Sequence, residues 1–171
     1  MCASLAESDR KSGFAALITP HTRVLVLGSL PGEASLAAGQ YYANPRNQFW
    51  ALIGAVIERN DLPGLAYSDR LDLLAARGIG LWDVFTSASR RGSLDSAIKQ
   101  AAAAPLAELA QRLPALQAIA FNGKLAAKAG RKALGSAPLT LIDLPSSSPA
   151  HAAIRYDGKL ERWAALKQFL I

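Results

Sequence analysis

Polar and aromatic side chains that could bind a ligand follow the first apolar run of the chain. That run ends in the turn GSLPG (residues 28–32), where two glycines permit a tight backbone and a proline fixes one φ angle. The turn matches neither G-x-G-x-x-G nor a Walker loop, so it does not by itself predict nucleotide binding. The tract YYANPRN (residues 41–47) then adds a phenol, two amides and a guanidinium that packing does not account for: Tyr42, Asn44, Arg46 and Asn47.

Three further apolar runs carry or end in polar groups. Asp83 lies within LWDVF, where an unpartnered carboxylate costs several kcal/mol, so it is either a cap that ends an element or an acceptor aimed into a pocket. Asn122 follows the third run and either caps the next helix or faces the same pocket. The tract LPSSSPAH (residues 144–151) follows the fourth, and its serines suit either phosphate contacts or an ordinary polar loop.

The elements that must position these groups alternate between strands and helices. Apolar runs predict strands at residues 23–27, 79–85, 116–121 and 139–144, and periodic apolar positions predict helices at 47–58, 68–77, 105–113, 124–134 and 158–170. Near-continuous apolar strands separated by helices indicate an α/β fold in which a central four-stranded parallel sheet is covered on both faces. Ligands bind beyond the carboxyl ends of such strands, so the polar segments are expected to converge on one site.

The length, composition and net charge of the chain restrict the class of protein. With 171 residues, a single domain is expected at residues 13–171, preceded by a flexible tail at residues 1–12. The tail lacks the apolar centre of a signal peptide and no apolar run approaches 18 residues, which predicts a cytoplasmic protein without a membrane span. One cysteine and two histidines are too few for a convincing metal site, so no metal and no cofactor are expected. The net charge of +6 favours an anionic partner such as nucleic acid.

Taken in order, these segments resemble the uracil-DNA glycosylase superfamily. GSLPG is similar to its first motif, YYANPRNQFW to the segment before the first helix of the mismatch-specific branch, and LPSSSPAH stands where the Pro-Ser second motif is expected. The combination looks closest to the hypoxanthine-DNA glycosylase (DNA-deoxyinosine glycosylase) branch, over about residues 23–170. The resemblance implies a monofunctional DNA repair glycosylase that flips a deaminated base, chiefly hypoxanthine, out of DNA and hydrolyses its N-glycosidic bond with a positioned water.

The resemblance also implies roles for single residues. Tyr42 aligns with the aromatic ring on which the flipped base stacks, and Asp83 with the base-reading position, where a carboxylate would accept N1–H of hypoxanthine or N3–H of uracil and repel adenine. Leu30 and Leu144 stand where relatives have polar catalytic groups, so Asn47 and Asn122 are expected to replace them. Base contacts are further implied for Gly28, Ser29, Leu30 and Asn44, and DNA contacts for Arg46, Lys124, Ser146, Ser147, Ser148 and Pro149, with Arg90 and Arg91 as additional phosphate contacts.

Other interpretations stay open. The chain could release uracil from G/U mismatches, since the carboxylate of Asp83 serves both bases. It could be a non-catalytic lesion-binding protein, which the leucines at positions 30 and 144 would explain. It could also be an unrelated α/β enzyme acting on a phosphorylated metabolite. The expected partner is DNA containing deaminated bases, bound by a monomer.

Overall fold

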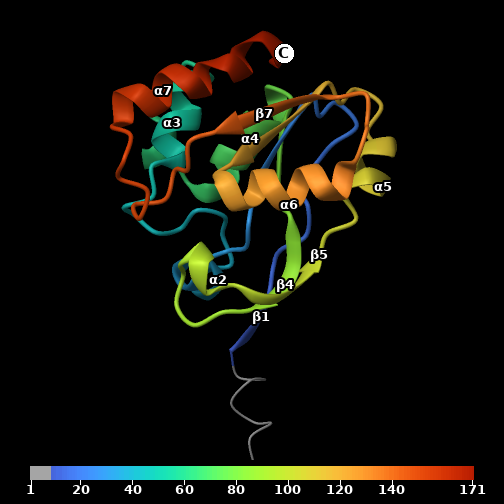
Figure 1. The fold of residues 1–171 in the computed structure, drawn as a ribbon. Coiled ribbons are helices and arrows are strands. Elements are labelled where there is room, and N and C mark those ends of the chain that lie inside the picture. Colours follow the sequence, from blue (N-terminus) through green and yellow to red (C-terminus); the bar gives the residue numbers. More distant parts are fainter. Residues whose placement is uncertain (1–8) are drawn as a thin grey trace, which may run out of the picture.

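The computed structural model describes residues 9–171 and contains a central sheet of four parallel strands (Figure 1). The strands are β2 (Val24–Gly28), β3 (Ile79–Asp83), β6 (Ala118–Asn122) and β7 (Thr140–Leu144), in the order β3-β2-β6-β7. All residues of β2 and β6 are buried, as expected for strands covered on both faces. The predicted four-stranded parallel sheet is confirmed.

Helices cover both faces of this sheet, which confirms the three-layer α/β/α arrangement. On one face α3 (Phe49–Val56), α4 (Tyr67–Ala76) and α7 (Tyr156–Trp163) enclose a core that includes Val24 and Val26. On the other, α5 (Leu106–Gln111) and α6 (Lys124–Leu134) enclose a core that includes Leu25 and Leu27. Alternate residues of one apolar strand therefore serve two cores. Figure 1 shows α6 crossing one face of the sheet.

A second, antiparallel sheet was not predicted. It consists of β1 (Arg10–Ser12), β4 (Phe85–Ser89) and β5 (Lys99–Ala103) in the order β1-β4-β5. The predicted strand at 79–85 is in fact β3 followed by β4, separated at Val84. Arg10–Ser12 form a paired strand and therefore do not belong to a loose tail. Residues 1–8 of the expected tail, which include Cys2, lie outside the described residues.

Short helices complete the chain. The six-residue helix α2 (Glu33–Ala38) follows the GSLPG turn and was not predicted. The 3-10 helices are η1 (Leu62–Gly64), η2 (Asp95–Ala97) and η3 (Ala164–Phe169), the last of which continues α7. None of the helices found in residues 9–171 combines the length and apolar character that crossing a bilayer requires.

Candidate active site

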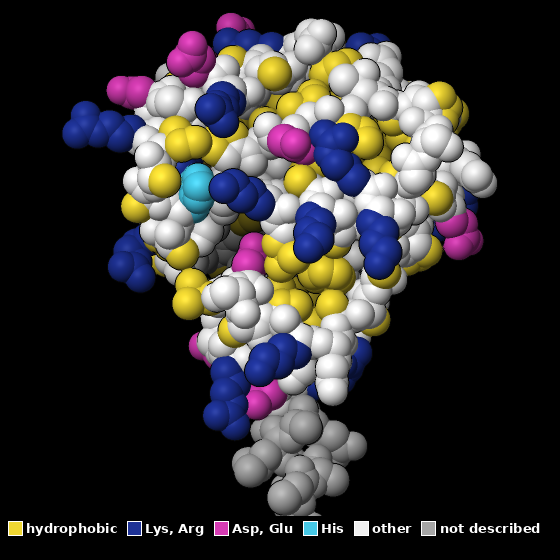
Figure 2. All heavy atoms as spheres, in the orientation of Figure 1, with side chains coloured by type: hydrophobic (Ala, Val, Ile, Leu, Met, Phe, Trp, Pro, Cys, Tyr) yellow, Lys and Arg dark blue, Asp and Glu magenta, His cyan; other side chains and the backbone are white. Residues whose placement is uncertain are grey.

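A cleft of about 1170 Å³ opens at the carboxyl edge of the central sheet and is visible as a hollow in Figure 2. It is bounded by the GSLPG turn, the segment between α2 and α3, the ends of β3 and β6, and the loop after β7. Of the residues that the sequence placed in the site, all except Arg90 and Arg91 line it: Gly28, Ser29, Leu30, Tyr42, Asn44, Arg46, Asn47, Asp83, Asn122, Lys124, Ser146, Ser147, Ser148 and Pro149. The expected convergence of the polar segments on one site is therefore observed.

Asp83 and Gly28 are paired on neighbouring strands at the inner end of the cleft. Asp83 is only 4% exposed, and its Oδ2 atom is covered and has no hydrogen-bond partner among residues 9–171. A Cβ atom on residue 28 would lie 2.8 Å from Asp83 Oδ1 and 3.2 Å from the Tyr42 hydroxyl, so only glycine fits beside the carboxyl group. Asp83 ends β3 and caps no helix, which favours the second of its two interpretations, an acidic group facing a pocket.

The electrostatic surroundings of Asp83 favour its neutral form. Burial raises the pKa of the carboxyl group to about 7, and the negative charge of Asp95 adds to the rise, while the guanidinium of Arg90 opposes it. A carboxylic acid that titrates near neutral pH at the end of a cleft is typical of functional sites.

Tyr42 is held in a strained backbone conformation by contacts on several sides. Its φ angle of +54° lies in the left-handed region, which costs a non-glycine residue about 1–3 kcal/mol. One face of its ring stacks on Phe49, with ring centroids 3.8 Å apart. Trp50 Nε1 donates to the Tyr42 carbonyl at 3.1 Å, and Asn122 Nδ2 donates to its hydroxyl at 3.3 Å. Since Tyr42 also lines the cleft, its ring extends an aromatic stack to the cavity.

Asn122 forms hydrogen bonds that hold the loop after β7 against the site. Its Oδ1 atom accepts a hydrogen bond from the Ser147 backbone amide and its Nδ2 group donates to Ser147 Oγ, both at 2.9 Å. Ser147 is only 1% exposed, and its carbonyl accepts from the Gln48 backbone amide at 2.9 Å. Trp163 Nε1 donates to the Pro145 carbonyl at 3.0 Å. Ser147 is thus a buried anchor, and the expected phosphate contact by its hydroxyl is not supported.

The asparagines of the YYANPRN tract shape the entry to α3. Asn47 Oδ1 accepts from the Phe49 backbone amide at 2.9 Å, and Asn44 Oδ1 accepts from the Arg46 backbone amide at 3.0 Å. Both are side-chain turns that fix the backbone ahead of a helix. The turn uses one of the two lone pairs of Asn47 Oδ1, so the other lone pair and the Nδ2 group stay available for further hydrogen bonds.

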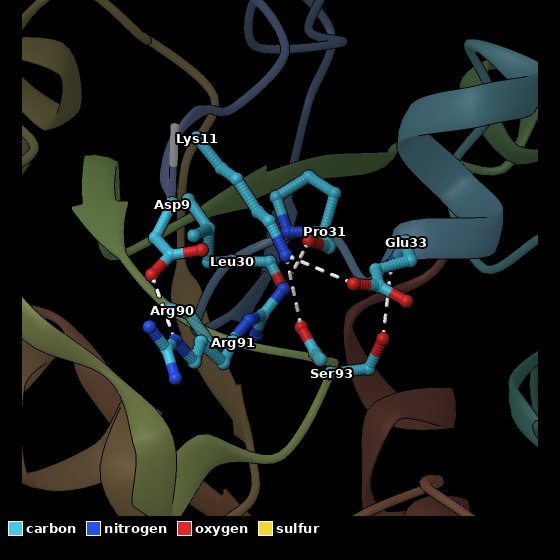
Figure 3. Close-up of polar contacts among 9 residues, drawn as sticks. Asp9, Lys11, Leu30, Pro31, Glu33, Arg90, Arg91 and Ser93 are labelled. Carbon is cyan, nitrogen blue, oxygen red and sulfur yellow. Dashed lines mark hydrogen bonds and ion pairs between the residues drawn. The ribbon is translucent and has the colours of Figure 1, made fainter. Parts of the chain in front are cut away.

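Arg90 is buried against the GSLPG turn, whereas the sequence analysis expected it to be available for a phosphate contact. Its side chain is 1% exposed and donates to the carbonyls of Leu30 and Pro31. Burial lowers its pKa, whereas the nearby carboxylates raise it. Arg91 is exposed but forms an ion pair with Asp9 at 2.9 Å and does not line the cleft. Figure 3 shows both arginines beside the turn.

One wall of the cleft was missed by the sequence analysis. It is formed by residues 93–96, carried between β4 and β5. Ser29 Oγ donates to Asp95 Oδ1 at 2.5 Å, which ties the wall to the GSLPG turn. The backbone amide of Glu33, the first residue of α2, donates to Ser93 Oγ at 2.9 Å (Figure 3). Leu94 lies between these anchors and is 56% exposed. The signal in the sequence was the turn-forming RRGS tract in a segment of small residues.

The rim of the cleft is basic. Arg46, Lys124 and Arg162 line it, and dark-blue side chains border the hollow in Figure 2. The hydroxyls of Ser146 and Ser148 accept from backbone amides within their own loop and keep their O–H donors for other partners. Pro149 and Ala150 form its exposed tip. Across residues 9–171, histidine, cysteine and acidic side chains form no cluster of three that could hold a metal ion.

Comparison with known proteins identifies the family to which these features correspond. The model of the Uracil DNA glycosylase superfamily matches residues 15–169. A hypoxanthine DNA glycosylase of Methanosarcina acetivorans is 40% identical over 156 residues, which cover 91% of this chain and 97% of that protein. A hypoxanthine DNA glycosylase of Methanosarcina barkeri is 42% identical over 115 residues, which cover 67% of this chain and 72% of that protein.

A solved structure shares the fold. The solution NMR structure of a candidate uracil DNA glycosylase from Methanosarcina acetivorans superposes with a TM-score of 0.80 at 36% sequence identity. The superposition covers 94% of this chain and 98% of that one. The resemblance inferred from GSLPG, YYANPRNQFW and LPSSSPAH is confirmed by the family match and these relatives.

Proposed function

Because the chain belongs to the Uracil DNA glycosylase superfamily, we propose that it is a monofunctional DNA glycosylase. It removes deaminated bases from DNA, chiefly hypoxanthine from deoxyinosine, and acts as a monomer in the cytoplasm. The observation that carries this proposal is the buried carboxyl group of Asp83 beside Tyr42 at the inner end of the cleft, in a chain with 40% identity to a named hypoxanthine DNA glycosylase.

The extruded base lies against the free face of Tyr42. Stacking on an aromatic side chain contributes about 1–3 kcal/mol per base, and Phe49 behind Tyr42 keeps the ring in place. Asp83 contacts the Watson–Crick edge of the base. The backbone amides of Ser29 and Leu30, in the turn that Arg90 supports, hold a carbonyl oxygen of the base.

Hydrolysis depends on placing water and on stabilising the departing base. Leu30 and Leu144 offer no polar side chain, so Asn47 positions the water through its amide group. A carboxamide is a poor base, and the barrier falls chiefly because fixed dipoles stabilise developing charge, each contributing about 3 kcal/mol. Asn122 acts indirectly, since its side chain is occupied by Ser147 and Tyr42.

The rim binds the phosphate backbone. Arg46 and Lys124 provide charge, and Ser146 and Ser148 provide hydroxyl donors. Pro149 at the exposed loop tip enters the gap that the flipped base leaves. The contacts are independent of sequence, as a repair enzyme requires.

The decisive experiment is a panel of oligonucleotides that contain inosine, uracil, xanthine or a thymine mismatch, treated with alkali after incubation. We expect strand cleavage at inosine above all other positions. Preferential cleavage at uracil would support the second candidate, a uracil glycosylase for G/U mismatches, because a group that contacts N1–H of hypoxanthine also fits N3–H of uracil. Tight binding of these oligonucleotides without any cleavage would show a lesion-binding protein.

A further inference from the structure

Within the described part of the chain, the carboxyl group of Asp83 has no hydrogen-bond or ion-pair partner that would stabilise a negative charge. In residues 9–171, its Oδ2 atom and Arg90 Nε are the covered side-chain atoms without a hydrogen-bond partner. The guanidinium of Arg90 is directed to the carbonyls of Leu30 and Pro31. A buried carboxylate without partners costs several kcal/mol, whereas a neutral carboxylic acid has no net charge to desolvate.

The groups around Asp83 do not reverse this preference. Burial has the largest effect and raises its pKa to about 7; Arg90, which follows β4, lowers the pKa, and Asp95 in η2 raises it. The phenols of Tyr41 and Tyr42 face Asp83 from the segment before α3, and burial raises the pKa of both, so they stay protonated and uncharged. Near neutral pH, a large fraction of Asp83 therefore carries a proton.

A proton at this place would assist base release. As the glycosidic bond breaks, negative charge develops on the departing base, and a carboxylate beside the base would repel that charge. A neutral acid instead offers a donor for O6 and an acceptor for N1–H, which are complementary to this edge of hypoxanthine. With leucine at positions 30 and 144, Asp83 is the acidic side chain that sits deepest in the cleft, at 4% exposure.

We infer that Asp83 reacts in its neutral form and donates its proton to the departing base, a role that rests on the glycosylase activity proposed above. The bond between C1′ of the sugar and N9 of the base breaks, and its electron pair leaves with the base. The oxygen of water bonds to C1′, and the proton of Asp83 passes to the base. The proton released by water returns through solvent to the carboxylate left on Asp83, so the step needs no further reactant.

The test is the pH profile of hypoxanthine release in single turnovers, at saturating enzyme. We expect the wild-type rate to be constant below about pH 7 and to fall about tenfold for each pH unit above it, as for an acid that must be protonated. A rate that rises with pH through this range would show that Asp83 acts as a carboxylate acceptor, and would overturn the inference.

Two variants sharpen the test. Asp83→Asn keeps an N–H donor of similar shape but has no proton to transfer, so its rate should be about 100-fold lower at pH 6 and independent of pH. Asp143→Asn is the matched control, because Asp143 also lines the cleft but is 61% exposed and paired with Arg131. It should keep the wild-type profile.

The outcomes separate this inference from the proposed function. If the wild-type protein releases no base from inosine or uracil at any pH, both fail. If it releases hypoxanthine with a flat or rising profile, or if Asp83→Asn keeps the wild-type decline, only the role of Asp83 as a proton donor is overturned. The wild-type profile decides the question even if Asp83→Asn does not fold.

Discussion

Asn122 forms two hydrogen bonds with Ser147: its Oδ1 atom accepts from the Ser147 backbone amide and its Nδ2 group donates to Ser147 Oγ, both at 2.9 Å. The same Nδ2 group reaches the Tyr42 hydroxyl at 3.3 Å. One amide side chain at the end of β6 therefore joins the loop after β7 to the aromatic wall of the cleft. We propose that Asn122 contributes to activity by positioning the loop and the tyrosine.

Asn122→Ala should lower base release and stability together. Loss of the three hydrogen bonds leaves buried polar groups unpaired, which costs about 1–3 kcal/mol in the free energy of unfolding, and displacement of the loop should reduce the single-turnover rate about 100-fold. Ser147→Ala is the matched variant, since it keeps the bond from its backbone amide to Asn122 and should lose less than about tenfold. Urea unfolding and oligonucleotide cleavage measure the two effects, and a normal rate in Asn122→Ala would contradict this assignment.

Substitution of Asn47 should lower the rate of base release much more than the stability of the protein. Asn47→Ser keeps an oxygen acceptor for the Phe49 amide, whereas Asn47→Ala removes it at a cost of about 1 kcal/mol in unfolding free energy. Neither variant has the amide group that we propose positions water, so both should lose about 100-fold in base release. A near-normal rate in Asn47→Ser would transfer the water-positioning role to another group.

Gly28→Ala should inactivate the site without unfolding the protein. The new Cβ atom would lie 2.8 Å from Asp83 Oδ1, so the carboxyl group must move. We expect at least a tenfold loss of base release, with the unfolding midpoint little changed, because misplacing a catalytic group is costly for the rate. Gly64→Ala is the control, since its Cβ atom would meet open space and the backbone there is not left-handed.

The free energy of unfolding should decrease between about pH 4 and about pH 7 because Asp83 binds its proton more tightly in the folded state. Its pKa rises on folding from 3.8 to about 7, so the folded state binds the proton more tightly. Its contribution is fully present below about pH 4 and is lost as the pH rises to about 7, at about 1.4 kcal/mol per pH unit. Asp83→Asn removes this dependence and should be the more stable protein at pH 8. Equilibrium unfolding at several pH values checks this, and equal slopes for both proteins would refute it.

Lys124→Ala should weaken DNA binding in a salt-dependent manner. Lys124 is exposed at the rim of the cleft, and loss of one phosphate contact should lower the slope of log K against log salt by about 0.9. Lys99→Ala is the control, because Lys99 is also exposed but lies in β5 and does not line the cleft. Fluorescence anisotropy over a range of salt concentrations measures the slope.

The sequence predicted the central layers well because their signals are strong and local. Continuous apolar runs located the four parallel strands, and α6 begins and ends where its periodicity places it, at Lys124 and Leu134. The antiparallel sheet was missed because β4 (FTSAS) and β5 (KQAAA) have neither alternation nor β-branched runs. Their strand conformation comes from pairing with each other and with β1, which no local pattern encodes.

The site was predicted as a set of residues but not as a set of roles. Position after a strand was sufficient to find Tyr42, Asp83 and Asn122, since topology brings the strand ends together. The burial of Arg90 and Ser147 depends on tertiary contacts, so the sequence did not reveal that both side chains are almost inaccessible to solvent. The effect of Asp95 on the pKa of Asp83 acts between two different elements, β3 and η2, and likewise has no local signature.

The separate sheet that carries residues 93–96 gives this scaffold an exchangeable part. Its loop between β4 and β5 can vary at the exposed Leu94 without altering the strands that bear Asp83 and Asn122. Since Asp95 on this loop raises the pKa of Asp83, a replacement that includes Asp95 would also retune the acid at the far end of the cleft. Enzymes built on one framework thereby have a route to diverge in both the lesions they admit and the acidity at which they work.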